Sequence, residues 1–147
     1  VNPKGLILYS RNYKQEQEST DTNFDSETIY TYSGTNLAKT VFSFYRKYKD
    51  AYYVAESRQK NFDAAGRLTS YISETTTIYS DTDLRKFRSE SHYFYDNKGR
   101  VTQMEYKTNS ITQSVYYFTY DGDVVAIEVQ HSRMNGRTPL FTYRLVK

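Results

Sequence analysis

The sequence predicts an all-β fold, an antiparallel β-meander of about ten strands built from repeated hairpins. Turn-forming residues recur about every 10 to 15 residues, as in all-β domains. No stretch shows the 3.6-residue period of an amphipathic helix. The 17 Tyr residues are spread over strand-like positions, where aromatic side chains suit a pleated surface. The sheet is expected to stay open and curved or to roll into a barrel, because twist and shear decide between these forms.

Length and composition favour one folded domain spanning residues 1–147. Only 37% of the residues are hydrophobic, yet 17 Tyr and 8 Phe can form an aromatic core. The net charge of +3 indicates a solubilising surface, so we expect no nucleic-acid partner. The sequence contains no apolar run long enough for a transmembrane segment. The absence of cysteine excludes disulfides, thiolate metal sites and thiol nucleophiles.

The chain opens at Val1 rather than at a methionine, which indicates that a targeting segment has been removed. A lipid-attachment cysteine could precede Val1. The first strand is predicted at 6–13, and the polar, acidic stretch 14–25 is predicted to be a loop. Further strands are predicted at 29–32, 37–49, 52–62, 67–79, 84–95, 100–108, 111–120, 124–131 and 140–146. The turns between them are predicted at 33–36, 50–51, 63–66, 80–83, 96–99, 109–110, 121–122 and 135–136.

Two of these turns share one signature, which the segment 93–106 shows most completely. Asp96 can accept a hydrogen bond from the backbone two residues on, and Gly99 can adopt the positive φ that closes the loop. Asp63 and Gly66 repeat this spacing, with an arginine after each glycine and a threonine two residues later. The pair Asp121 and Gly122 is the strongest short hairpin pattern. The residues predicted to build turns are Asp63, Gly66, Asp96, Gly99, Asp121 and Gly122.

The segments 62–69 and 95–102 resemble the YD-repeat, or Rhs-like, family of bacterial secreted and cell-envelope proteins, whose repeats read Tyr-Asp-x-x-Gly-Arg-Leu. The segments 120–124 and 32–37 resemble shortened copies. The resemblance implies a small stand-alone relative that is rich in β-strands and extracytoplasmic: secreted, periplasmic or an outer-membrane lipoprotein. It implies no catalytic residues.

Tyrosines are the strongest candidates for a binding role. Taken together, the groups Tyr52/Tyr53, Tyr93/Tyr95 and Tyr116/Tyr117/Tyr120 place rings on both faces of the sheet. Exposed rings could stack on sugars or form a protein contact patch. The alternative is that they form cross-strand ladders that only hold the sheet together.

Other polar groups have simpler interpretations. The pairs Asp81/Asp83 and Asp121/Asp123 lack the further oxygen ligands of a calcium loop, so we expect turn capping and no metal site. His92 shares a strand face with Glu90, whereas His131 and Glu128 fall on opposite faces, and we expect solvated or hydrogen-bonded histidines. The basic runs 46–49 and 85–88 interleave cations with rings, but alternation splits each run over two faces. Charged residues that protect sheet edges explain both runs.

These observations predict a non-enzymatic extracytoplasmic protein, without cofactor, that binds a protein or glycan partner or has a structural role at the cell envelope. Alternation along the predicted strand 124–131 places Val125, Ile127 and Val129 on one face. One alternative is a barrel that carries a small apolar ligand in an interior lined by Phe44, Tyr117, Val125 and Ile127. The least favoured alternative is an enzyme, which would require convergence of carboxylates among Glu74, Glu90, Glu105 and Glu128.

Overall fold

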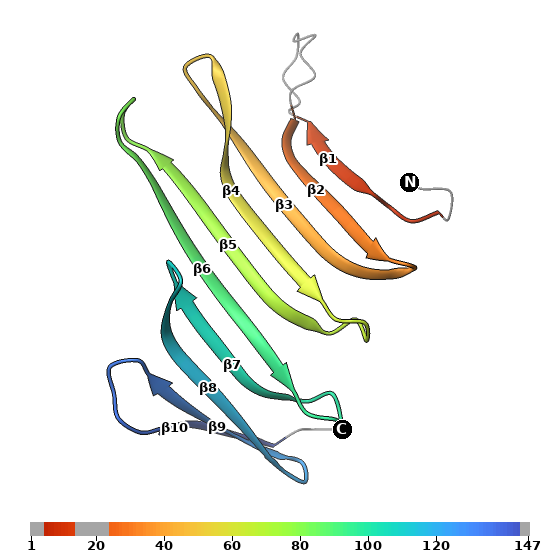
Figure 1. The fold of residues 1–147 in the computed structure, drawn as a ribbon, viewed down its shortest axis with the longest axis vertical. Coiled ribbons are helices and arrows are strands. Elements are labelled where there is room, and N and C mark those ends of the chain that lie inside the picture. Colours follow the sequence, from red (N-terminus) through yellow and green to blue (C-terminus); the bar gives the residue numbers. More distant parts are fainter. Residues whose placement is uncertain (1–4, 14–23, 145–147) are drawn as a thin grey trace. The chain divides into compact units, whose positions relative to one another are not determined.

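A computed structural model describes residues 5–13 and 24–144, and every regular element in these ranges is a β-strand. The strands follow one another in chain order (Figure 1). They are β1 (Tyr9–Tyr13), β2 (Phe24–Ser33), β3 (Asn36–Tyr48), β4 (Ala51–Phe62), β5 (Leu68–Ile78), β6 (Leu84–Tyr95), β7 (Val101–Thr108), β8 (Ile111–Asp121), β9 (Val124–His131) and β10 (Thr138–Arg144).

The chain divides into two compact units, unit 1 from Val1 to Arg88 and unit 2 from Ser89 to Lys147. Within each unit, every strand pairs antiparallel with the next one along the chain. The order is β1-β2-β3-β4-β5 in unit 1 and β6-β7-β8-β9-β10 in unit 2. The first and last strands of each set do not pair with each other, so each sheet is open. The predicted antiparallel meander is confirmed, whereas a single domain over 1–147 stays a prediction.

The strand boundaries differ from the predicted ones at a few places. Residues 6–8 precede β1, and β2 already begins at Phe24, so the end of the predicted loop 14–25 is strand; 14–23 lies outside the described residues. The turn after β3 is at 49–50 instead of 50–51, because Lys49 adopts the left-handed backbone with φ of 54°. The last strand begins at Thr138, and the end of the predicted strand, 145–146, lies outside the described residues.

Few side chains are buried, so a closed aromatic core does not form among the described residues. The buried apolar residues are Ala55, Val125 and Val129, and none of the large side chains is completely buried. Within each unit all strands belong to one layer, and most rings therefore lie half-buried on a sheet face. The prediction of an aromatic core is wrong in this respect, because rings that line a single layer cover the sheet without being enclosed.

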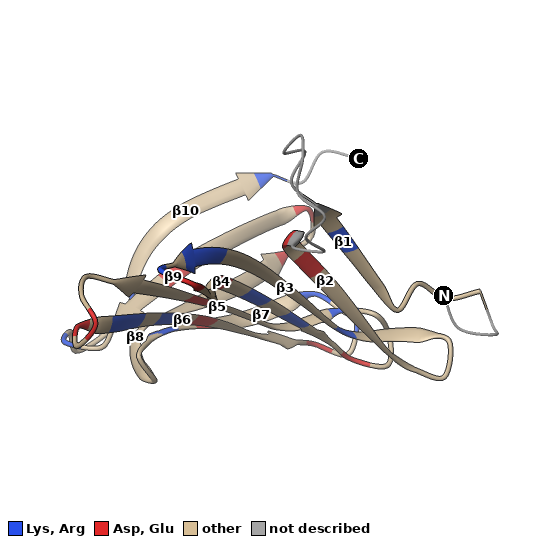
Figure 2. Ribbon diagram, turned by 90° about the horizontal axis from the view of Figure 1, so that it is seen from above, with Lys and Arg blue, Asp and Glu red and all other residues tan. Residues whose placement is uncertain are grey.

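In unit 1 both faces of the sheet carry charges. Residues that pair across an antiparallel ladder point to the same face. On one face, Glu56 and Arg58 of β4 pair with Phe44 and Phe42 of β3. On the other face, Glu74 of β5 pairs with a serine of β4. Rings and charges are therefore mixed on both sides, and Figure 2 marks the charged positions along the strands.

Each Asp-x-x-Gly turn is accompanied by a β-bulge. The pairing register shifts between the last two residues of β4 and between the last two residues of β6. Thr69 and Thr102 are the extra residues on the facing strands. The Thr69 hydroxyl donates to the Asn61 carbonyl at 3.1 Å, and the Thr102 hydroxyl donates to the Phe94 carbonyl at 3.3 Å. The repeated threonine of the sequence motif thus occupies the same structural position in both hairpins.

Candidate binding surface

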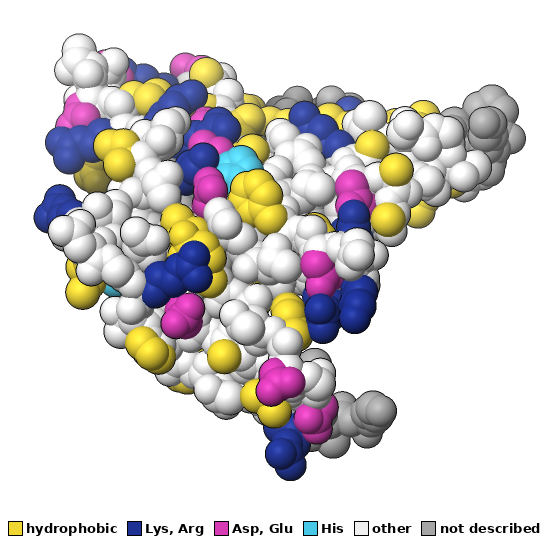
Figure 3. All heavy atoms as spheres, turned by 60° about the horizontal axis from the view of Figure 1, so that its bottom comes forward, with side chains coloured by type: hydrophobic (Ala, Val, Ile, Leu, Met, Phe, Trp, Pro, Cys, Tyr) yellow, Lys and Arg dark blue, Asp and Glu magenta, His cyan; other side chains and the backbone are white. Residues whose placement is uncertain are grey.

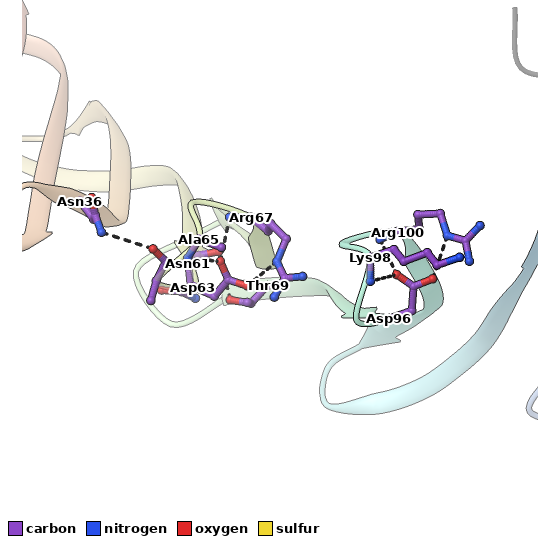
Figure 4. A network of polar contacts seen from close by, with 10 residues as sticks. Asn36, Asn61, Asp63, Ala65, Arg67, Thr69, Asp96, Lys98 and Arg100 are labelled. Carbon is purple, nitrogen blue, oxygen red and sulfur yellow. Dashed lines mark hydrogen bonds and ion pairs between the residues drawn. The ribbon is translucent and has the colours of Figure 1, made fainter. Parts of the chain in front are cut away.

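The turn between β4 and β5 is held by the carboxylate of Asp63. One carboxylate oxygen, Oδ1, accepts from the backbone N–H groups of Ala65 and Arg67, both at 2.9 Å. The other, Oδ2, accepts from Arg67 Nε at 2.7 Å. The Gly66 N–H donates to the Asp63 carbonyl at 2.9 Å, and Gly66 has a φ of 78°. Figure 4 shows these contacts at the corner of the hairpin.

The turn between β6 and β7 repeats the arrangement. Asp96 Oδ1 accepts from the N–H groups of Lys98 at 2.9 Å and Arg100 at 2.8 Å, and Oδ2 accepts from Arg100 Nε at 2.8 Å. Gly99 donates to the Asp96 carbonyl at 3.0 Å and has a φ of 78°. The two turns therefore have the same structure within their own units.

These bonds lower the pKa of Asp63 and of Asp96 below the ordinary value. The largest cause is the backbone hydrogen bond from Arg67 or Arg100, to which the arginine side chain and the Asx bond add, while desolvation opposes them. The ionised carboxylate accepts these bonds better than the neutral acid does, so both turns are stabilised by charged aspartates.

One face of unit 2 collects apolar and aromatic side chains from all five strands. Tyr93, Met104, Tyr116 and Val129 are successive partners across β6, β7, β8 and β9. Parallel rows of such partners extend on either side. We name this surface the aromatic face, and it comprises Tyr93, Tyr95, Val101, Met104, Tyr106, Tyr116, Phe118, Tyr120, Val125, Ile127, Val129, Phe141 and Tyr143.

The charged residues of the strands are confined to the opposite side of this sheet. Arg100 of the turn between β6 and β7 differs, since its guanidinium lies 4.5 Å from the Tyr120 ring centroid. We name the side opposite the aromatic face the polar face. Every Asp, Glu, Lys and Arg in the part of β6 within unit 2 and in β7 to β10 lies on the polar face. These residues are Glu90, Glu105, Lys107, Asp121, Glu128 and Arg144. His131 lies on the aromatic side, where its Nδ1 is 2.8 Å from the Ser114 hydroxyl. A sheet with such complete separation has one face suited to contact with another apolar surface.

Solvent exposure varies across the aromatic face. Val129 is 2% exposed and Val125 is 7% exposed, whereas Phe141 and Tyr143 on β10 are 58% and 50% exposed. The rings of Phe141 and Tyr143 are neighbours, with centroids 5.8 Å apart. The face therefore has a shielded centre and an open side along β10.

The predicted tyrosines of unit 2 are not all on this face. Tyr93, Tyr95 and Tyr116 belong to the aromatic face, but Tyr117 lies on the polar face. There the Arg137 guanidinium is 3.5 Å from the Tyr117 ring centroid, and the Tyr117 hydroxyl donates to a glutamine of β9 at 3.2 Å. The barrel lining proposed from sequence is therefore wrong in unit 2, because Tyr117 faces away from Val125 and Ile127.

The predicted tyrosines of unit 1 also lie on opposite faces. Tyr52 pairs with Lys47, whose Nζ is 6.0 Å from the ring centroid, and Tyr53 pairs with Arg46. Tyr53 and Arg46 line a hollow of ≈ 230 Å³ together with Phe44 and the threonines of β5. This hollow is smaller than typical small-molecule pockets of roughly 300–1,000 Å³.

Sequence reasoning missed several members of the aromatic face, among them Phe118, Phe141 and Tyr143. The alternation of Val125 with Ile127 pointed to an apolar side of β9. The residues opposite them could be assigned only from the pairing register, which the sequence does not reveal. Tyr120 is further tied to the sheet, since its hydroxyl donates to the Val101 carbonyl at 2.9 Å.

The four glutamates considered for catalysis each lie beside a basic group. As the alternation predicts, His92 Nε2 lies 3.0 Å from Glu90 Oε2. The His92 contact is a hydrogen bond, and the contacts with Lys and Arg are charge pairs on a sheet surface. The partners are Lys86 at 3.7 Å and Arg88 at 3.9 Å for Glu74, His92 for Glu90, Lys107 at 3.3 Å for Glu105 and Arg137 at 3.7 Å for Glu128.

The capping prediction for Asp81 and Asp83 is wrong. In this turn the Ser80 hydroxyl is the cap, since it accepts from the Asp83 N–H at 3.1 Å. Asp81 instead accepts from Lys49 Nζ at 2.5 Å and from the Tyr48 hydroxyl at 3.1 Å. The hydrogen bond from Lys49 is the largest cause that lowers the pKa of Asp81, and the bond from Tyr48 adds to it.

Asp121 and Gly122 lie where the chain passes from β8 to β9. Asp121 is the last residue of β8, and Gly122 has a φ of 57°. Asp123 lies 3.7 Å from Arg144. Within residues 5–13 and 24–144, no group of three or more His, Asp or Glu side chains could hold a metal ion.

The described pairing of β3 with β2 extends only to Phe44, and the run 46–49 pairs with β4 on its other side, so edge protection stays a prediction for this run. Its cations lie over rings: Arg46 is 5.8 Å from the Phe44 centroid, and Lys49 is 5.7 Å from the Tyr48 centroid. In the run 85–88, Arg85 donates two hydrogen bonds to Asp83, both at 3.1 Å. Figure 3 accordingly shows acidic side chains among the basic ones on the face in view.

No family model, curated protein or solved structure matches the chain. In the part of the chain that the structure describes, no helix is long and apolar enough to cross a membrane.

Proposed function

We propose that the chain is a non-enzymatic, extracytoplasmic binding protein of the cell envelope, and that unit 2 binds a protein partner through its aromatic face. The supporting observation is that all charged strand residues in the part of β6 within unit 2 and in β7 to β10 lie on one face. The centres of protein interfaces are enriched in Tyr, Phe and Met and depleted of Lys, Asp and Glu. The aromatic face has this composition.

A protein partner fits this face better than a glycan. Met104, Ile127 and Val129 alternate with the rings, and such aliphatic side chains favour an apolar protein surface. Amide and carboxylate groups that could bind sugar hydroxyls, such as Gln103 and Glu105, lie on the polar face, where they bond to each other at 3.0 Å.

The exposed side of the face supplies the anchors. Phe141 and Tyr143 present about half of their surface to solvent. Tyr93 and Tyr116 lie further in and are half-buried. Aromatic side chains bring large contact areas at low cost in side-chain entropy, so a partner would gain most from covering these rings.

The proposed location rests on the resemblance of the two Asp-x-x-Gly-Arg turns to repeats of secreted and envelope proteins. Cell fractionation with an antibody against the chain tests it. We expect the protein in the envelope fraction or the medium, and its recovery from the cytosol would contradict this part of the proposal.

The binding function is tested by affinity capture from envelope proteins followed by mass spectrometry. The double variant Tyr93→Ser/Tyr116→Ser removes two rings from the aromatic face. The control Phe94→Ser/Tyr117→Ser removes two rings from the polar face of the same strands. We expect a partner that binds the wild type and the control but not the first variant. Identical capture by all three proteins would contradict the proposal, provided that circular dichroism shows all three folded.

A further inference from the structure

The last strand of unit 2 has a free edge. β10 pairs with β9 along one side, and no described strand of unit 2 pairs with its other side. All residues of β10 are exposed, including Leu140 at 39%, Phe141 at 58% and Tyr143 at 50%. A free strand edge presents backbone N–H and C=O groups that can pair with another strand.

Most of this edge lacks the features that usually prevent such pairing. Proteins protect edges with charges, prolines or bulges. In β10 the proline, Pro139, and the bulge between it and Phe141 both lie near the start of the strand. The stretch from Leu140 to Tyr143 carries no formal charge. The single charge, Arg144, lies 3.7 Å from Asp123, which precedes β9, so it is drawn toward the paired side.

We propose that β10 pairs antiparallel with β10 of a second copy of the chain, about a two-fold axis at Thr142. Paired side chains must share a face of the sheet, so Phe141 and Tyr143 of one copy can pair only with residues of the aromatic face of the other. In the register centred on Thr142, Phe141 of each copy pairs with Tyr143 of the other copy, and Pro139 lies outside the paired stretch. It also places Arg144 opposite Leu140, so no two cations meet.

This pairing would continue the aromatic rows of one copy into those of the next. The contact involves one short strand from each copy and is smaller than a stable interface, which buries about 1,200–2,000 Å². The dimer is therefore weak and depends on concentration. The edge of β10 is distinct from the aromatic face itself, so this inference does not rest on the proposed function.

Sedimentation of the 147-residue chain from micromolar to millimolar concentration tests the pairing. We expect the wild type to shift from monomer to dimer. Thr142→Lys and Thr142→Glu each place like charges opposite each other at the two-fold axis and should remain monomeric, whereas an equimolar mixture of the two should dimerise. Thr119→Lys is the matched control, because Thr119 is exposed on β8 in the same cross-strand row as Thr142. A monomeric wild type, or a dimer that Thr142→Lys leaves intact, would overturn the inference.

Oxidative cross-linking detects the same contact at low affinity. The chain has no cysteine, so a single introduced thiol reports one position without background. Thr142→Cys should form a disulfide-linked dimer faster than Thr119→Cys, since only residue 142 meets its own copy. Equal rates for the two variants would also overturn the inference.

Discussion

The two units use the same hairpin corner but distribute their charges differently. The Asp63 turn of unit 1 and the Asp96 turn of unit 2 match bond for bond, including the bulge beside each. In unit 1, however, Glu56 and Glu74 lie on opposite faces of the sheet. In unit 2 all charged strand residues lie on the polar face.

This difference shows that the residues that form a hairpin turn and the residues that set the polarity of the two strand faces can vary independently. The corner depends on an Asp-x-x-Gly spacing that forms local hydrogen bonds whatever the strands contain. The faces depend on which alternate residues are apolar and on the register that aligns them. A chain can therefore repeat one turn and still build a solvated sheet in one unit and a two-faced sheet in the other.

The largest expected effect is that of a charge placed on the aromatic face. Val129 is 2% exposed, so Val129→Asp should lower the free energy of unfolding by about 3 kcal/mol or more, because a buried carboxylate would have no partner. Val54 in unit 1 is 38% exposed, and Val54→Asp should cost less than about 1 kcal/mol. Urea unfolding followed by circular dichroism measures both. Equal losses would remove the contrast between the units.

Substitution of the two corner glycines should have smaller and equal effects. Gly66→Val and Gly99→Val should each cost about 1–3 kcal/mol, because a branched side chain disfavours a φ of 78°. Asparagine tolerates this backbone, so Gly66→Asn and Gly99→Asn serve as controls and should cost clearly less. Thermal melting measures the series. Unchanged melting of both valine variants would show that the corners do not need the left-handed conformation.

Acid should weaken both corners together. The pKa of Asp63 and of Asp96 in the folded protein lies below the ordinary value of 3.8. The stability that the two ionised carboxylates contribute is therefore fully present above pH 3.8 and is lost as the pH falls through the folded pKa. The melting temperature should therefore fall as the solution is acidified below the ordinary value. Asp63→Asn and Asp96→Asn should each make this fall shallower. If one variant alone changes the acid dependence, the two turns are not equivalent.

The smallest expected effect is a gain at the turn between β7 and β8. Ser110 is a non-glycine residue with a φ of 67°. Ser110→Gly should raise the free energy of unfolding by about 0.5 kcal/mol, because glycine adopts this conformation without strain. Lys49→Gly, at a φ of 54° in unit 1, relieves the same strain but removes the hydrogen bond to Asp81, so its gain should be smaller. Differential scanning calorimetry measures both variants, and a loss of stability in Ser110→Gly would contradict the strain.

The sequence was sufficient to predict the strands because the turns are local. Asp and Gly at fixed spacing mark the corners at 63–66 and 96–99, and β6 and β9 have their predicted bounds. Errors in the bounds occurred where the local pattern is weaker, as at Lys49, a residue type that rarely adopts a positive φ.

The candidate surface could be predicted only in part, because the faces depend on register. The alternation of Val125, Ile127 and Val129 identified one apolar side of β9, but the partners of these residues on β8 and β10 are not encoded by spacing. A shift of one residue reverses every side chain of a strand, which is why Tyr117 was grouped with Val125 although it lies on the other face.

The absence of charged strand residues from one face of unit 2 is tested most directly by nuclear Overhauser contacts across β7, β8 and β9. We predict contacts from the ring protons of Tyr116 to the methyl groups of Met104 and Val129, which are its cross-strand partners. Contacts from the Tyr117 ring to these methyl groups would contradict the account, because they would place the charged residues of β7 and β9 on the face assigned here to the rings.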